Sequence, residues 1–189
     1  MDTHILKLLK NRKASRAFSN QPLSQETIKT LMEATQLSAS CFNKQSWRFL
    51  FLNDEAGLKK GRTALSKGNS WASAAPLLVV GFSKPNLDCQ LPDGREYYLF
   101  DLGLATQNLM LQATELNLIA RPFAGFSPKK LKAEFNIPEE YEIYVMLAVG
   151  YEGNINELDE ELQKKSQAQR TRKPLEHNFF LNKFEISEK

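Results

Sequence analysis

The sequence predicts a single domain of the α+β class, in which helices alternate with a few buried strands. The chain has 189 residues, which is enough for one domain that buries most of its unfolded surface. Hydrophobic residues make up 42% and charged residues 25%, the ordinary usage of a folded globular protein. No repeat, low-complexity segment or linker divides the sequence. We therefore expect one domain over residues 1–189, with 168–189 as an extended C-terminal arm.

Apolar residues at helical spacing predict a short helix over 5–9 and a second helix over 24–35. Ser24 is a suitable N-cap for the second helix because its hydroxyl can accept from a free backbone amide of the first turn. The other elements expected in this half are a strand at 48–52, a lysine-rich amphipathic helix at 54–66 and a fully apolar strand at 77–82.

The second half opens with a loop over 85–94 and a long helix over 95–117. This helix is apolar on nearly all sides, which indicates burial between the sheet and another helix or subunit. The remaining elements are a short strand at 118–124, a helix that begins at Ser127-Pro128, a strand at 141–151 and a polar helix at 156–167.

Two polar segments near the N-terminus carry the strongest functional signal. Residues 12–18 place three permanent cations within five positions, and residues 38–47 are rich in amides and hydroxyls. Clustered arginine suits a phosphate, and amides suit the hydrogen-bonding edge of a planar heterocycle. Together they suggest a phosphorylated aromatic cofactor. The alternatives are a solvated basic turn for the first segment and a simple helix-to-strand loop for the second.

Other function classes have little support. The net charge of +3 is weak and spread along the chain, so we expect no nucleic-acid partner. Hydrolase and nucleotide-binding motifs such as Gly-x-Ser-x-Gly, Walker A and GxGxxG are missing. Cys41 and Cys89 form no metal-binding motif, so no metal is expected. A disulfide between them stays open, although a chain of this size does not need one. We find neither a signal peptide nor a membrane span, and we expect a cytoplasmic protein.

The two polar segments, in this order, resemble the nitroreductase family of FMN-dependent oxidoreductases. The family pattern R-R/H-S-x-R/K-x-F is matched by Arg12, Lys13, Arg16 and Phe18, and S-P-S-x-x-N-x-Q-P-W by Ser38, Ser40, Asn43, Gln45 and Trp47. The chain departs at Ala14, Ala39 and Ser46, where Ser, Pro and Pro are usual. The resemblance continues at 97–105, 108–111, 122–126, 149–151 and 170–175, and so spans almost the whole chain.

The resemblance implies a nitroreductase-like fold, a mixed central sheet wrapped by helices, built as an intertwined homodimer with FMN at the interface. It implies an FMN-dependent enzyme that uses NAD(P)H to reduce a small-molecule oxidant. Nitroaromatics, quinones and similar electron-poor compounds are the implied class. Hydride would pass through flavin N5 in a ping-pong reaction, with no catalytic side chain. The alternative is a flavin-binding or regulatory protein of the same fold with little turnover.

The resemblance also assigns cofactor contacts. One subunit would supply the N-terminal cations, with Arg16 near the flavin N1/O2 edge, and its partner would supply the amide-rich loop. Asn69 would face the pyrimidine edge, or simply form a turn. Backbone amides near Ala124 and Gly125 would face N5. The full set of implied contacts is Arg12, Lys13, Ala14, Arg16, Ala39, Ser40, Cys41, Asn43, Gln45, Asn69, Pro122, Phe123, Ala124, Gly125, Arg170 and Arg172. Because Ala14 lacks the usual hydroxyl, we expect weaker FMN binding.

Overall fold

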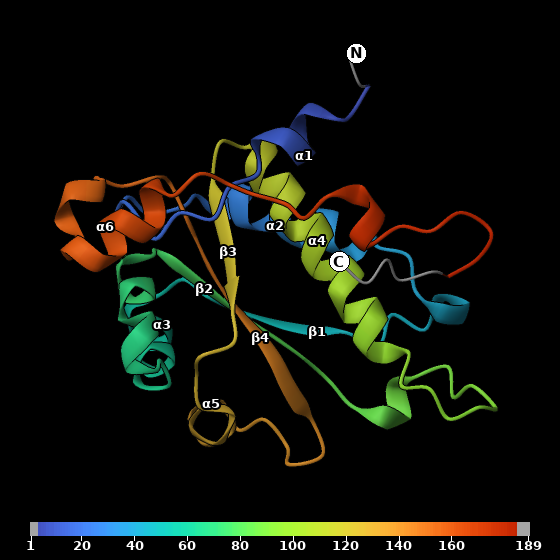
Figure 1. The fold of residues 1–189 in the computed structure, drawn as a ribbon. Helices are drawn as coiled ribbons and strands as arrows, with labels where there is room; N and C mark the ends of the chain where they lie inside the picture. Colours follow the sequence, from blue (N-terminus) through green and yellow to red (C-terminus); the bar gives the residue numbers. More distant parts are fainter. Residues whose placement is uncertain (1–3, 185–189) are drawn as a thin grey trace.

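A four-stranded sheet forms the centre of the protein, in a computed structural model that describes residues 4–184 (Figure 1). The strand order is β1-β2-β4-β3. The strands are β1 (Arg48–Leu52), β2 (Leu77–Ser83), β3 (Ile119–Phe123) and β4 (Glu142–Gly150). All four lie where the apolar runs of the sequence predicted them, which confirms the α+β class.

The pairing of the strands corrects one prediction. We expected a mixed sheet, but all three pairings within the described chain are antiparallel. The connections explain this. The connections from β1 to β2 and from β3 to β4 each enter a neighbouring strand from the same end of the sheet, which makes those pairs antiparallel. The connection from β2 to β3 crosses to the opposite end, but these two parallel strands do not pair because β4 lies between them.

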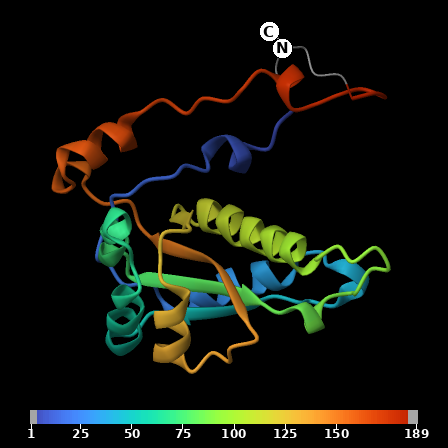
Figure 2. The same ribbon diagram turned by 60° about the horizontal axis from the view of Figure 1, so that its bottom comes forward.

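One face of the sheet is covered by α2 (Gln25–Gln36) and α4 (Tyr98–Glu115) (Figure 2). Leu77 and Val79 of β2 point toward these helices and pack with Leu31 of α2 and Leu109 of α4, all fully buried. The predicted N-cap is confirmed, because Ser24 Oγ accepts from the amide of Thr27 at 3.0 Å.

The other face is covered by α3 (Glu55–Thr63) and α5 (Pro128–Phe135), with the 3-10 segment η2 (Lys67–Ala74) beside them. Leu78 and Val80 of β2 point into this second core. Because β2 alternates between two cores, positions 77–82 are all apolar, as the sequence indicated. The predicted helix at 54–66 ends three residues early, at Thr63.

The outer side of α4 is exposed in the single chain, so its predicted burial against another helix or subunit stays a prediction. Phe100 is 54% exposed on this side, and Gly103 is exposed next to it. The short helix α1 (Lys7–Asn11) and the chain after α6 (Glu160–Gln167) lie farther out than α4 (Figure 2). No helix within residues 4–184 is long and apolar enough to cross a membrane.

The C-terminal arm leaves α6 and crosses above the body of the domain (Figures 1 and 2). Its only regular element in the described range is the 3-10 turn η5 (Leu175–His177). Leu175, Phe179 and Leu181 are 70–90% exposed. The last part of the predicted arm, 185–189, lies outside the described residues, as do residues 1–3. The division into one domain plus an arm stays a prediction.

Candidate functional site

A cavity of about 400 Å³ opens between the N-terminal segment, β3, α6 and the start of the arm. Its lining is dominated by cations, with one carboxylate, that of Glu152. The cationic lining residues are Arg12, Lys13, Arg16, Arg121, Lys165, Arg170 and Arg172. The structure thus brings together both ends of the chain, as the sequence predicted for Arg12, Lys13, Ala14, Arg16, Arg170 and Arg172.

Hydrogen bonds to backbone carbonyls hold this cavity in shape. The Arg170 guanidinium donates to the carbonyls of Lys10 and Arg12, both at 2.8 Å, and so ties the arm to the N-terminal segment. Arg121 Nη1 donates to the carbonyl of Ala14 at 2.7 Å, which ties that segment to β3. The cavity wall is therefore assembled from three parts of the chain that are far apart in sequence.

The positive charge of the cavity is largely uncompensated. Lys13 pairs with Glu152 at 2.5 Å, and Lys165 pairs with Glu161. Within residues 4–184, none of the five lining arginines has a carboxylate within ion-pair distance. The pKa of Arg12 is lowered by burial and then by repulsion from Arg170 and Arg172.

Arg121 shows the same excess of charge most strongly. Its pKa falls to about 10, first because the guanidinium is buried and second because Arg16 repels it. Its guanidinium also lies over the Trp71 ring at 5.0 Å. A bound dianion would relieve both the desolvation and the repulsion.

Two buried polar atoms of this cavity lack partners among the described residues: Arg121 Nε and Ser166 Oγ. Buried polar atoms in folded proteins almost always have a partner, so an unpaired donor marks a place where a ligand can supply an acceptor. Phosphate oxygens are such acceptors. The residues present therefore fit the phosphate end of FMN.

The amide-rich loop forms a second group, built around η1 (Cys41–Asn43). Phe42, Asn43 and Gln45 all have positive φ angles, at 46°, 55° and 48°. Non-glycine residues adopt this backbone region at a free-energy cost, and several together indicate a loop held by its surroundings. Two hydrogen bonds within the loop stabilise it. The backbone amide of Gln45 donates to Ser40 Oγ at 3.0 Å, and the side-chain Nε2 of Gln45 donates to Asn43 Oδ1 at 3.1 Å.

Asp101 of α4 anchors this loop to the core. Its carboxylate is 1% exposed and accepts from the Cys41 amide at 3.2 Å and from the Ser46 hydroxyl at 3.3 Å. Burial is the main cause that raises the pKa of Asp101. The carbonyl of Ser46 accepts from Ser83 Oγ at 2.7 Å. The serine that replaces the usual proline therefore makes its own hydrogen bonds.

The loop carries a disulfide that the sequence left open. Cys41 and Cys89 are bonded, with their Cα atoms 5.8 Å apart, which answers the question that the sequence left open. The bridge joins the loop to the connection between β2 and α4. Spacing along the sequence does not reveal such proximity, because 48 positions separate the two cysteines. Trp47, expected in the core, is buried.

The third group lies where β3 ends. Asn69 Nδ2 donates to the carbonyl of Gly125 at 3.1 Å, and Asn69 Oδ1 accepts from Trp71 Nε1 at 3.2 Å. The Asn69 side chain is thus engaged within the chain, and its contact with a flavin edge stays a prediction. The contact of the Ala124 and Gly125 backbone amides with flavin N5 likewise stays a prediction.

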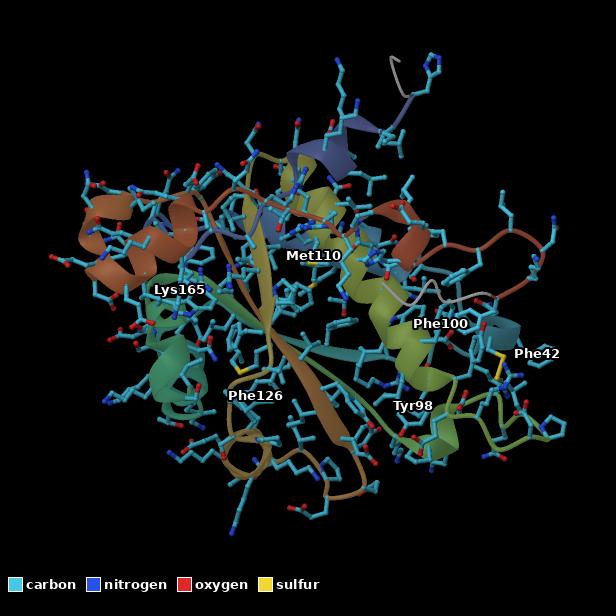
Figure 3. The ribbon with its side chains drawn as sticks, in the orientation of Figure 1. Phe42, Tyr98, Phe100, Met110, Phe126 and Lys165 are labelled. Carbon is cyan, nitrogen blue, oxygen red and sulfur yellow. A yellow bond between two sulfur atoms is a disulfide. The ribbon has the colours of Figure 1, made fainter. Side chains whose placement is uncertain are left out.

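The three groups of predicted site residues do not all lie on the same side of the molecule. Pro122 and Phe123 belong to β3, which also carries Arg121 into the basic cavity. The loop over 39–45 lies at the opposite side of the molecule, as the positions of Phe42 and Lys165 show (Figure 3). Within one chain, the loop does not join the cavity.

Sequence reasoning missed seven residues that line the cavity: Ser15, Arg121, Glu152, Ile155, Lys165, Ser166 and Ala168. Arg121 directly precedes the motif at 122–126, and this position was the available signal. No motif in the predicted polar helix at 156–167 singled out Lys165 or Ser166. Within residues 4–184 no group of three His, Cys, Asp or Glu side chains could hold a metal ion.

The fold and the cavity define an α+β protein with a basic cavity built from both chain ends. The sequence matches the nitroreductase family over residues 9–80 and 64–151. The chain therefore belongs to the nitroreductase family.

Two relatives illustrate the similarity in sequence. A protein of Archaeoglobus fulgidus, named as an NADH dehydrogenase/NAD(P)H nitroreductase, is 28% identical over 155 residues, covering 77% of this chain and 84% of that protein. MhqN of Bacillus subtilis, named as an NAD(P)H nitroreductase, is 23% identical over 183 residues, covering 79% and 88%.

Solved structures share the fold. The crystal structure of an oxidoreductase containing FMN matches with a TM-score of 0.88 at 24% identity, covering 98% of this chain and 95% of that one. A nitroreductase from Exiguobacterium sibiricum in complex with FMN matches with a TM-score of 0.78 at 19% identity, covering 96% and 99%.

Proposed function

We propose that this protein is an FMN-dependent oxidoreductase that takes electrons from NAD(P)H. The observation that carries the proposal is the basic cavity: among residues 4–184 its five arginines have no carboxylate partner, and Arg121 Nε and Ser166 Oγ are buried and unpaired. That arrangement suits the FMN phosphate. The family membership and the FMN-containing structures of the same fold support the same cofactor.

The chain's own residues would divide the binding of the cofactor among them. Arg12, Arg170 and Arg172 would hold the phosphate, and Arg16 would stabilise negative charge at the N1/O2 edge of the ring. The backbone N–H groups of Ala124 and Gly125 would face flavin N5. Bound FMN would supply the hydride chemistry, accepting from the nicotinamide and donating to the oxidant in turn.

The site is proposed to be shared between two copies of the chain. The 39–45 loop and the basic cavity lie on opposite sides of one chain (Figure 3), so a second chain would have to bring its loop to this cavity. Apolar side chains exposed on α1, α4 and the arm are available for such an interface, since a homodimer buries apolar surface. They include Leu6, Leu9, Phe100, Leu175 and Phe179.

Nitroaromatics, quinones and similar electron-poor compounds are the proposed oxidants, reduced in a ping-pong sequence. Both halves of that reaction would use the same flavin face, and no acid–base side chain is required of the protein. We also propose a cytoplasmic location. The Cys41–Cys89 bridge is the feature that speaks against it, because disulfides are rare in that compartment.

An absorbance scan of the purified protein tests the function. We expect a yellow protein whose colour bleaches anaerobically with NADH or NADPH and returns with a quinone. Mass spectrometry of the released chromophore should show FMN. A yellow protein that neither nucleotide bleaches would leave only the alternative, a flavin-binding protein with little turnover. A colourless protein that takes up no added FMN would refute both.

A further inference from the structure

We propose that Ser166 supplies the phosphate of the bound cofactor with the hydroxyl that Ala14 lacks. The inference rests on the proposed function and names a phosphate-binding residue in α6, outside the N-terminal motif. It concerns the Ser166 hydroxyl and the Arg121 guanidinium, which line the same cavity. The family pattern contains neither residue.

The first observation is the state of the Ser166 hydroxyl. Its oxygen is buried and has no partner among residues 4–184. Hydroxyls in helices commonly donate to the carbonyl four positions back. Thr35, Thr106 and Thr114 of this chain do so, at 2.7, 2.8 and 2.9 Å. Ser166 lies in the last turn of α6, and its hydroxyl does not make that bond.

The second observation is the place of Ser166. It lines the same cavity as Ala14, together with Lys165 of the same helix. Ala14 contributes only its carbonyl, which accepts from Arg121 Nη1. That bond leaves Arg121 Nε buried and without a partner, so both unpaired donors belong to one cavity.

The chemistry of the two donors selects the ligand. A hydroxyl can donate one hydrogen bond, and Nε of a guanidinium can donate another beside it. A phosphate monoester offers several accepting oxygens and a double negative charge, which suits a cavity with five arginines lacking carboxylate partners. An apolar ligand or a cation would leave both donors unsatisfied. The neutral ribityl chain would satisfy them without using the charge.

The experiment compares FMN with riboflavin, which lacks the phosphate. Flavin fluorescence quenching gives the dissociation constant of each ligand for the protein stripped of cofactor. We expect Ser166→Ala to weaken FMN binding by about tenfold to a hundredfold and to leave riboflavin binding unchanged. Inorganic phosphate should displace FMN from the wild-type protein more readily than it displaces riboflavin. Ser73→Ala, which removes an exposed hydroxyl of η2, is the matched control and should bind both flavins normally.

A rescue experiment addresses the substitution for position 14. Ala14→Ser placed in the Ser166→Ala background should restore most of the FMN affinity, and should gain less in the wild-type background. If Ser166→Ala folds poorly, Ser166→Cys, which nearly keeps the volume of the side chain, replaces it. We expect the same loss of FMN binding from Ser166→Cys.

Equal loss of FMN and riboflavin binding in these variants would make Ser166 a structural residue and overturn the inference. Unchanged FMN binding would overturn it as well, while leaving the proposed function intact. Failure of the wild-type protein to bind either flavin would instead overturn the proposed function, and this inference with it.

Discussion

Removing the Cys41–Cys89 bridge is expected to destabilise the protein by about 2–4 kcal/mol. The variant of choice is Cys89→Ser, because Cys41 lies in the candidate cofactor loop and its amide is bonded to Asp101. The magnitude follows from the 48 positions between the cysteines. Closing a loop of that length removes about 14 cal/mol/K of unfolded-state entropy, or about 4 kcal/mol at 25 °C. The measured value should be lower where the unfolded chain keeps some structure.

Urea unfolding followed by circular dichroism measures the effect. The oxidised wild-type protein should have the highest midpoint, and a phosphine reductant should lower it. Cys89→Ser should have the lowered midpoint from the start and should not respond to the reductant. A thiol titration in urea should find two free thiols in the wild-type protein only after reduction.

Two results would refute this reasoning. A wild-type midpoint that the reductant leaves unchanged, with two thiols released, would show that the bridge contributes no stability. A response of Cys89→Ser to the reductant would show that the effect does not come from the bridge. We also expect weaker FMN binding by the reduced protein, because the loop with three positive φ angles would then depend on Asp101 and its serine contacts alone.

Three further predictions concern other parts of the chain. Gly125→Ala would place a Cβ 2.1 Å from Asn69 Nδ2 and should lower the free energy of unfolding by about 1–3 kcal/mol, whereas Gly68→Ala, with nothing within 4 Å, should be nearly neutral in the same urea experiment. Burial raises the pKa of Asp101, so the folded state holds the carboxyl proton more tightly than the unfolded chain does. The stability that comes from this proton is largest below the ordinary Asp pKa and is lost as pH rises through the raised pKa of the folded state. Asp101→Asn should therefore lose stability relative to wild type at about pH 4 and compare more favourably at pH 7; an equal difference at both values would contradict the assignment. Deleting the residues after Pro174 should weaken a homodimer in sedimentation at micromolar concentration, and an unchanged dimer would exclude the arm from the interface.

The sequence predicted the elements that depend on local patterns. Long apolar runs marked β2 and β4, since strands buried on both faces have few polar positions. A capping serine marked the start of α2. The antiparallel order and the 3-10 segment η2 were not predictable in the same way, because both depend on where distant parts of the chain pack.

The candidate site divides along the same line. The cations at the chain ends were predicted because charge clusters are visible in sequence, and the structure brings them into one cavity. Arg121 was missed because it is a single charged residue in an apolar strand, and Ser166 because it is one of many polar residues in a polar helix. Their importance lies in being buried without a partner, which is a property of the folded chain only.

The exposed side of α4 links the fold to the proposed shared site. The sequence predicted that this helix is buried between the sheet and another helix or subunit, and Phe100 and Gly103 are exposed in the single chain. An isologous contact through this side would cover the helix in both copies. The 39–45 loop and the basic cavity lie on opposite sides of the molecule, so a two-fold axis between them would place each loop toward the cavity of the other copy (Figure 3). The same contact would therefore cover the exposed apolar side of α4 and complete two equivalent sites. We accordingly expect cofactor binding and dimer formation to strengthen each other.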